Sequence, residues 1–234
     1  MNNISEVIKL FRIIDKNTNN LDFERTVFEG PIKTYIKFSL SPEEIEYTEE
    51  EREFRITCLN EELNEFILAC DNNDHDEKVD ALVDLLIFSV GTSYRMNNII
   101  DTLERYKTIN VNSISDHFSK LYIKKLIHIN NKESYNDLVI KDTLSFLIEQ
   151  FDSKTRNDIY ILNQIVAYCI HALKQYEPIE ILKSYYNMVV EANMNKTVGP
   201  LSKRGSFSID LVKPEGWQAP SLTKIKRKLK LKLK

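Results

Sequence analysis

The sequence predicts an all-α fold, and three observations support this prediction. Glycine and proline are scarce, with 5 Gly and 6 Pro in 234 residues, so the sharp turns that join many short strands are lacking. Apolar residues recur at three- and four-residue spacing through most of the chain, which is typical of amphipathic helices. They make up 42% of the sequence, enough to fill a core at this length. The length allows one large domain or one domain with a sizeable insertion.

Residues 1–47 are predicted to form an N-terminal helix and an irregular segment. The helix occupies residues 1–20, where five apolar residues follow helical spacing: Ile4, Val7, Ile8, Phe11 and Ile14. Gly30-Pro31 is a turn signal, and residues alternate over 34–38, which favours a short extended piece. Ser41-Pro42 indicates a helix start, because serine caps a helix and proline fits its first position.

The two strongest helices are predicted at 48–70 and 75–96. Their buried stripes are Leu59, Leu63, Phe66, Ile67 and Cys70 in the first, and Val79, Leu82, Val83, Leu86 and Val90 in the second. Asp74 precedes the second helix and is a candidate N-cap. Because the connection is short, the two helices are expected to form an antiparallel hairpin.

Further helices are expected beyond this hairpin. Their predicted positions are near 114–129, 138–151, 159–175 and 178–196. Residues 197–222 hold two patches of Gly and Pro, which predicts a loop or an arm wrapped around the body.

The net charge of −3 conceals an uneven distribution. Seven Lys and Arg lie in 224–234, so 25 basic residues elsewhere face all 35 acidic ones, a charge of about −10. Such a body is a poor general binder of nucleic acid and a good place for divalent cations. The basic tail, 223–234, is predicted to be a disordered solubilising end. Contact with nucleic acid or an anionic membrane surface through this tail is the alternative.

The cysteines and apolar runs favour a cytoplasmic location. Cys58, Cys70 and Cys169 are widely spaced among apolar residues, which predicts buried thiols in a reducing compartment. No apolar run reaches the roughly 18–20 residues of a membrane-spanning helix, so no membrane partner is expected. The first residues do not read as a secretory signal.

Acidic residues cluster on the predicted hairpin. The first helix carries Glu61, Glu62 and Glu65 in the string EELNE, and the second carries Glu77, Asp80 and Asp84 in EKVDALVD. Spacings of three and four place these acids on one face of each helix. Carboxylates that face each other repel unless a cation neutralises them, and hard oxygen ligands select Mg²⁺, Mn²⁺ or Ca²⁺. A plain solvated face is the alternative, but Asp80 and Asp84 border the apolar run VDALVDLLIF.

An acidic signature and three further strings, in order along the chain, resemble one enzyme superfamily. EELNE and EKVD, eleven residues apart, resemble the E-x-x-E…E-x-x-D signature of the all-α nucleoside triphosphate pyrophosphohydrolases. DALVDLLIFSVGTS at 80–93, VVEANMNK at 189–196 and KPEGWQAPSL at 213–222 resemble strings of phage-type MazG-like and phosphoribosyl-ATP-pyrophosphohydrolase-like members. The resemblance implies a MazG-like helical bundle over 48–222 that ends in a wrapping arm. Residues 97–160 exceed the usual family length and are read as a helical insertion.

The resemblance also implies the site residues. The metal ligands are Glu62, Glu65, Glu77, Asp80 and Asp84, with Mg²⁺ as the cofactor and Mn²⁺ as an alternative. In MazG itself the second pair would align with Ala81 and Asp84, so its register stays open. Glu61 or Glu62 would act on the attacking water, and Asn193, Lys196, Lys203 and Arg204 would bind phosphate. The arginine expected before Asn193 is absent. The lone tryptophan, Trp217, is expected to pack the arm onto the body, with stacking on a base as the alternative.

The reaction implied by the resemblance is hydrolysis of a (deoxy)nucleoside triphosphate to the monophosphate and pyrophosphate, controlling a nucleotide pool in a phage-infected cell. A dedicated dUTPase or dCTPase and a phosphoribosyl-ATP pyrophosphohydrolase are narrower alternatives. A third alternative is a non-catalytic helical module that binds nucleic acid through the tail. A homo-oligomer, dimer or tetramer, is also expected, because a two-helix hairpin cannot bury both of its faces alone.

Overall fold

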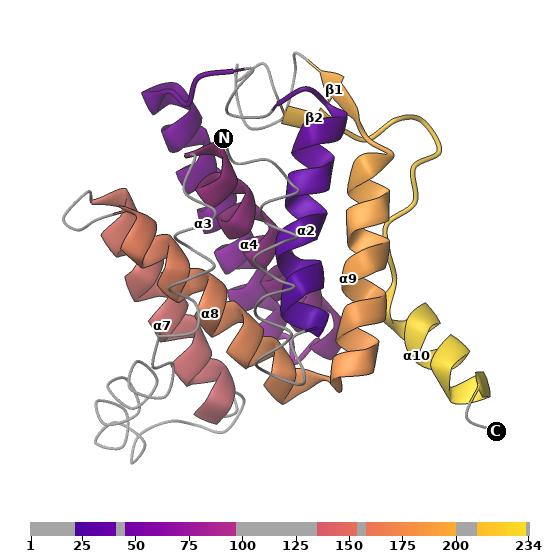
Figure 1. Cartoon of the computed structure of the whole chain (residues 1–234). Helices are drawn as coiled ribbons and strands as arrows, with labels where there is room; N and C mark the ends of the chain where they lie inside the picture. The colour runs from indigo at the N-terminus through magenta and orange to yellow at the C-terminus, as the bar shows by residue number, and fades with distance from the viewer. Residues whose placement is uncertain (1–21, 41–44, 97–134, 154–157, 200–209, 233–234) are drawn as a thin grey trace.

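The computed structural model of the chain describes residues 22–40, 45–96, 135–153, 158–199 and 210–232. Within these ranges the chain forms seven helices and one short two-stranded ribbon, so the predicted all-α fold is confirmed (Figure 1). The helices are α2 (Asp22–Lys37), α3 (Glu49–Asp71), α4 (His75–Arg95), α7 (Tyr135–Asp152), α8 (Asp158–Tyr176), α9 (Ile179–Met194) and α10 (Leu222–Lys232). The strands are β1 (Thr197–Gly199) and β2 (Asp210–Val212). The helices predicted at 1–20 and 114–129 lie outside the described residues.

The hairpin of α3 and α4 forms where the sequence predicts it. Thr48 caps α3, since its side chain accepts a 3.2 Å hydrogen bond from the amide of Glu51. Asp74 caps α4 in the same way and accepts from the amide of Glu77 at 3.2 Å. The helix start expected at Ser41-Pro42 falls outside the described residues. Residues 45–48 are not helical, so α3 begins only after its threonine cap.

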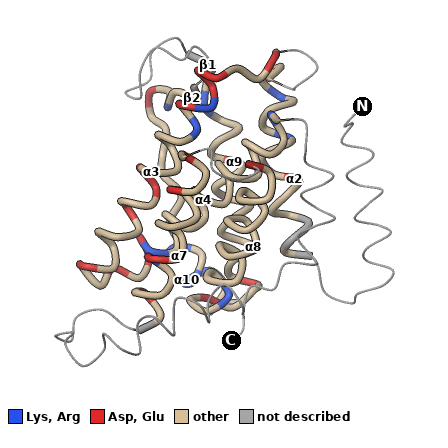
Figure 2. Tube along the Cα trace, turned by 90° about the vertical axis from the view of Figure 1, so that its left-hand side faces the viewer, with Lys and Arg blue, Asp and Glu red and all other residues tan. Residues whose placement is uncertain are grey.

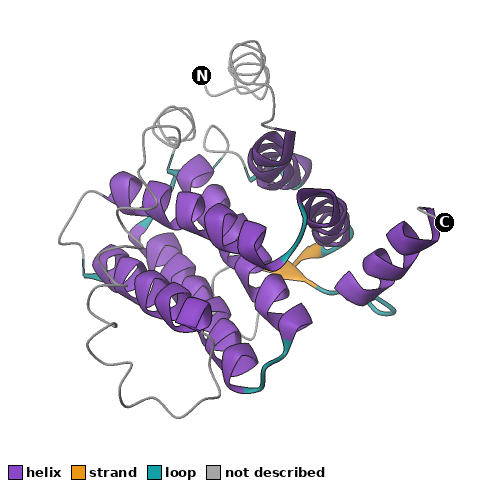
Figure 3. Ribbon diagram, turned by 90° about the horizontal axis from the view of Figure 1, so that it is seen from below, coloured by secondary structure: helices purple, strands orange, loops and turns teal. Residues whose placement is uncertain are grey.

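Helix α4 is the centre of the molecule. It packs against α3, α8 and α2, while α7 lies against α8 and α3, and α2 lies against α9. Figure 3 shows the helices gathered side by side, with the two short strands next to them. The apolar faces of these helices meet in one cluster of buried side chains. Helix α7, from the segment read as an insertion, contributes Ile140, Leu144 and Phe151 to that core. It is therefore part of the same globule as the hairpin.

The Gly30-Pro31 pair lies inside helix α2, so the prediction of a turn and an extended piece here is wrong. Proline lacks the amide hydrogen that would serve the carbonyl four residues earlier. That carbonyl belongs to Val27, and the hydroxyl of Tyr186 in α9 donates to it at 2.8 Å. A Cβ atom at Gly30 would lie 2.6 Å from Val190 Cγ2. The two residues that usually break a helix thus let α2 approach α9 closely.

A fully buried arginine holds the start of α3 against the end of α4. Arg95 donates from Nε to Glu51 Oε1 at 2.8 Å and from Nη2 to Glu51 Oε2 at 2.6 Å. It also donates to the backbone carbonyls of Leu40 and Ile45 at 2.8 and 2.9 Å. Arg55 donates to the same carboxylate at 2.8 Å. Charges this deeply buried require such paired partners.

The segment after α9 is more regular than a loop. Strands β1 and β2 pair antiparallel, with Thr197 opposite Val212. No sequence pattern indicates these strands, because each has only three residues and one such pair buries little surface. Residues 213–221 then run along the body as an arm, as predicted.

The basic tail forms helix α10, so the predicted disordered end is wrong. Leu222 and Ile225 are buried in the core. Lys226 bonds to Asp76 at 3.1 Å and also pairs with Glu177. Lys224, Arg227 and Lys228 stay exposed. Two buried apolar residues three apart, the partly buried Leu229 and one inward lysine dock a helix in which most other residues are basic.

All three cysteines are buried free thiols, as expected from their apolar neighbours. Across the described ranges, every helix is too short or too polar to span a lipid bilayer.

Candidate active site

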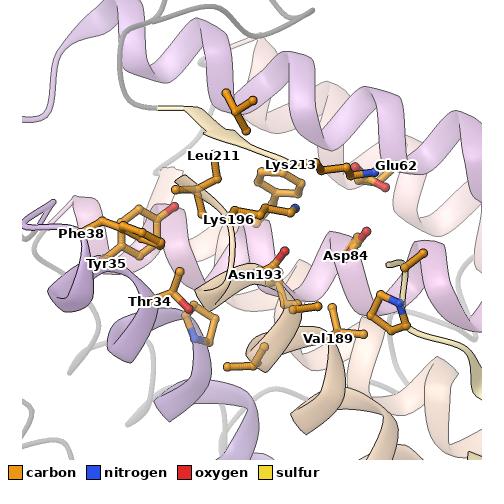
Figure 4. Close-up of a pocket in the computed structure, with 18 of the residues that line it drawn as sticks. Thr34, Tyr35, Phe38, Glu62, Asp84, Val189, Asn193, Lys196, Leu211 and Lys213 are labelled. Carbon is orange, nitrogen blue, oxygen red and sulfur yellow. The ribbon is translucent and has the colours of Figure 1, made fainter. Parts of the chain in front are cut away.

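A cavity of about 550 Å³ opens between α2, α3, α4, α9 and the C-terminal arm (Figure 4). Its lining divides into groups of different chemistry. Acidic side chains come from α3 and α4, basic and amide side chains come from the end of α9 and the arm, and aromatic side chains come mainly from α2, α3 and α4. The lining includes Tyr35, Phe38, Phe54, Arg55, Glu62, Glu65, Asp80, Asp84, Phe88, Asn193, Lys196, Lys213 and Trp217.

Four of the predicted acidic ligands line this cavity. Glu62 and Glu65 are three residues apart on α3, and Asp80 and Asp84 are four apart on α4, so each pair shares one helix face. Figure 2 shows the acidic positions along these two helices. Glu62 is only 3% exposed, whereas Glu65 is exposed and both aspartates are half-buried. The hairpin thus brings together acids from both of its arms.

The other two predicted acids do not line the cavity. Glu61 neighbours Glu62, but successive side chains on a helix point in directions about 100° apart. Glu77 is exposed one turn before Asp80. Burial first, and then the charges of Asp80, Asp74 and Glu65, raise the pKa of Glu77. Glu77 therefore lies outside the cavity but near enough to the acidic group for its charges to act on it, whereas Asp84 lines the cavity.

Asp80 is held by a tyrosine that sequence reasoning missed. The hydroxyl of Tyr185 in α9 donates to Asp80 Oδ1. Burial raises the pKa of Asp80, while the Tyr185 hydrogen bond and the charges of Lys213 and Lys196 lower it in part. The pKa of Tyr185 is itself raised by burial and by Asp80, so its hydroxyl stays a donor. Tyr185 falls on the buried stripe of α9, and that position alone does not distinguish it from a core residue.

Opposite the acids stand the predicted phosphate-binding residues that the structure describes. Asn193 and Lys196, from the end of α9, both line the cavity. Lys213 joins them from the arm, where it is the first residue of the KPEGW string. Figure 4 shows Asn193, Lys196 and Lys213 reaching into the same space as Glu62 and Asp84. Lys203 and Arg204 lie outside the described residues.

The aromatic end of the cavity was not predicted. Tyr35 projects from α2, and a Cβ atom at Gly91 would lie 2.8 Å from its ring, so this glycine lets Tyr35 approach α4. Arg55 donates to the Tyr35 hydroxyl, and its guanidinium carbon lies 5.2 Å from the centre of the Tyr35 ring. The sequence contains one signal for Arg55. Glu51 and Arg55 lie four residues apart and continue the buried stripe of Leu59 and Leu63 toward the N-terminus. Charged residues on an apolar stripe indicate a buried ion pair.

The carboxylates are near one another without forming a closed metal cage. In the described part of the chain, no three His, Cys, Asp or Glu side chains are grouped closely enough to hold one ion. The donors themselves are hard oxygens on two facing helices. They suit a cation that keeps several waters and completes its shell with substrate oxygens, as Mg²⁺ does.

One family model matches the chain. Residues 34–105 match the model described as phosphoribosyl-ATP pyrophosphohydrolase, which is less than half of the sequence. The matched segment runs from the end of α2 through α3 and α4 and contains all the predicted acids. No curated protein and no solved structure shows a significant match. The match supports nucleotide pyrophosphohydrolase chemistry in general terms. Residues 34–105 therefore match a MazG-like all-α nucleoside triphosphate pyrophosphohydrolase family, as the acidic motif predicted.

Proposed function

We propose that this protein hydrolyses a (deoxy)nucleoside triphosphate to the monophosphate and pyrophosphate with the aid of Mg²⁺. One observation carries the proposal. A single cavity holds four carboxylates from the hairpin, two lysines and an asparagine opposite them, and aromatic side chains at another part of its wall. Its volume of about 550 Å³ falls within the range of nucleotide-sized ligand pockets.

The donor chemistry of the cavity fits Mg²⁺. Glu62, Glu65, Asp80 and Asp84 supply carboxylate oxygens without an intervening thiolate or imidazole. Asp80 has a raised pKa, caused first by burial, and a cation next to it would favour its charged form. When bound, Mg²⁺ would neutralise phosphate charge and lower the pKa of a bound water.

The side chains of the chain have separate tasks in this proposal. Glu65, Asp80 and Asp84 would hold the metal in part through the waters that Mg²⁺ retains, and Tyr185 fixes the orientation of Asp80. Glu62 is the proposed general base, because it lines the cavity while its neighbour Glu61 does not. Asn193 and Lys196 hold phosphate oxygens by charge-assisted and amide hydrogen bonds.

The aromatic end is the proposed place of the nucleoside. Tyr35, Phe38, Phe54 and Phe88 line the cavity with flat apolar surface, on which a base can stack. The triphosphate then runs from this end toward the acids and lysines. This orientation separates the apolar part of the substrate from its charged part, as the lining does.

The test is pyrophosphate release from a panel of NTPs, dNTPs and phosphoribosyl-ATP, with Mg²⁺ and with EDTA. We expect release only with Mg²⁺, and a loss of at least about tenfold to a hundredfold in Asp84→Asn. Glu149→Gln, an exposed acid on α7 remote from the cavity, is the matched control and should behave as wild type. Orthophosphate as the product, or no release from any substrate, would contradict the proposal. The rank order of substrates separates a general enzyme from a dedicated dUTPase, dCTPase or phosphoribosyl-ATP hydrolase.

A further inference from the structure

Trp217 is fixed between the arm and the end of α9. Its ring nitrogen Nε1 donates a 3.0 Å hydrogen bond to the carbonyl oxygen of Ala192. Trp217 is half-buried and lines the cavity, and it is the only tryptophan in the chain. The packing role expected for it is therefore present together with a position at the candidate active site.

Two lysines stand over this indole ring. The ammonium nitrogen of Lys213 lies 4.6 Å from the ring centre, and that of Lys196 lies 5.5 Å from it. Both distances are within the range of cation–π attraction. Both ammonium groups are thus attracted to the same aromatic ring.

The β-ribbon brings the two lysines together. Thr197 of β1 pairs with Val212 of β2, so Lys196, just before β1, and Lys213, just after β2, are the next opposed positions. Both ammonium groups lie within 5.5 Å of one ring centre, and the repulsion between like charges in one region falls when an anion binds there. A ribbon of three residues per strand is therefore enough to pair residues that are 17 positions apart in the sequence.

Both lysines face the acidic side of the cavity. Each contributes to lowering the pKa of Asp80, although burial has the larger, opposite effect on that carboxyl. Lys196, Lys213 and Trp217 all line the cavity with Asp80. An anion bound to the lysines would lie next to the carboxylates that we propose hold Mg²⁺.

We propose that Lys196 and Lys213, supported by the Trp217 ring, form a binding site for a pyrophosphate group. Its place in catalysis, as the site of the leaving pyrophosphate, rests on the proposed function. The binding of pyrophosphate by these residues does not depend on the proposed function. Lys213 and Lys196 make the contacts, and Trp217 is a positioning residue that acts through them.

The intrinsic fluorescence of Trp217 reports on this site directly, because no other tryptophan contributes. We would titrate the full chain with pyrophosphate, with EDTA and with Mg²⁺, and repeat the titration with orthophosphate. Saturable change with pyrophosphate is expected, and Lys213→Met should weaken it roughly tenfold or more, because a charge-assisted contact is lost. Lys224→Met, an exposed lysine of α10, is the matched control and should bind as wild type does.

Calorimetry then tests the positioning role of Trp217 without its fluorescence. Trp217→Phe keeps an aromatic face for the lysines and should retain most of the pyrophosphate affinity. Trp217→Leu removes that face and should lose most of it, with the thermal midpoint serving as a check on folding. A purely structural role predicts that binding follows the thermal midpoint in both variants, and that result would overturn the positioning role.

Three outcomes overturn the site itself: no saturable response, equal affinity for orthophosphate and pyrophosphate, or wild-type affinity in Lys213→Met. The result also separates this inference from the proposed function. Pyrophosphate binding that depends on Lys213 in a protein that cleaves no nucleotide refutes the proposed function alone. If the protein hydrolyses nucleotides but Lys213→Met leaves its pyrophosphate affinity unchanged, only this inference is refuted.

Discussion

The hydroxyl of Tyr186 donates a 2.8 Å hydrogen bond to the carbonyl oxygen of Val27, the helical acceptor for which Pro31 has no amide hydrogen. A contact between α9 and α2 thus satisfies a buried group that the proline would otherwise leave without a partner. This contact explains how α2, which supplies Tyr35 to the cavity, continues through a Gly-Pro pair.

Tyr186→Phe tests this compensation. We expect the free energy of unfolding to fall by about 1–3 kcal/mol, because a buried carbonyl loses its donor. In a Pro31→Ala background the alanine amide can serve Val27, so the same tyrosine substitution should cost clearly less. Denaturant unfolding of the four proteins gives this double-mutant cycle. An equal cost in both backgrounds would show that Tyr186 acts by packing alone.

Tyr185→Phe should change the pH dependence of hydrolysis. The Tyr185 hydrogen bond lowers the pKa of Asp80 against the larger raising effect of burial, so removing it should raise that pKa further. Asp80 must be ionised to hold a cation, and the acid limb of the activity profile should move to higher pH. The shift should be roughly one to two pH units, the equivalent of a hydrogen bond to a charged group. Tyr160→Phe, on the exposed face of α8, is the control. An unchanged acid limb would show that the ionisation of Asp80 does not control the pH dependence of activity.

Glu51 should make the protein less stable in acid. Burial raises the pKa of Glu51, but the hydrogen bonds and charges of Arg95 and Arg55 outweigh this and leave it lowered. A carboxyl with a lowered folded-state pKa stabilises the protein above its unfolded pKa of about 4.3, and this is lost as pH falls through the folded value. The free energy of unfolding should therefore decline below about pH 5.

The variant Glu51→Gln isolates this contribution. At neutral pH it should destabilise the protein by about 3–5 kcal/mol, because two buried arginines lose their anionic partner. Its unfolding free energy should also vary less with pH in the acid range than that of wild type. Glu50→Gln, exposed one residue earlier, is the matched control. Denaturant melts from pH 7 to pH 3 measure both effects, and parallel acid profiles of wild type and Glu51→Gln would exclude Glu51 as a cause.

Helix α10 should be docked rather than free. Its anchors are the buried Leu222 and Ile225 and the ion pairs of Lys226. Ile225→Ala should weaken this docking by about 2 kcal/mol or more, the usual cost of truncating a buried isoleucine. Hydrogen exchange of the amides of 222–229 measures it, and those amides should lose protection while the amides of α4 keep theirs. Lys228→Ala, exposed on the same helix, should leave protection unchanged. Unprotected amides in the wild-type protein would instead support the prediction of a disordered C-terminal tail.

Periodicity was a reliable guide where one helix face is buried. The stripes led by Leu59 and Val79 predicted α3 and α4 nearly to their ends, because burial of an apolar stripe and local caps both depend on nearby residues. The turn and the extended piece predicted within 21–41, where the structure has helix α2, were wrong for the opposite reason. The partner that satisfies Val27 lies 159 residues away in the sequence, where no local pattern can indicate it.

The same distinction applies to the candidate site. The spacing of the acids identified a shared face on each arm of the hairpin, and four of them, including Asp84, line the cavity. Spacing could not decide between Glu77 and Asp84, because both stand on the acidic face of α4. Nor could it find Tyr185 or Lys213, since their roles depend on which side chains they meet.

What the sequence determined by itself was the all-α class, the hairpin of α3 and α4 and the clustering of carboxylates upon it. These follow from interactions between residues three or four positions apart, whose geometry a helix fixes. The tertiary structure decided which acids border the cavity, that a proline stays within α2, that the basic tail docks as a helix, and that Lys196 and Lys213 share one indole ring. Each of these depends on contacts between distant segments, and such contacts exist only once the core has brought those segments together.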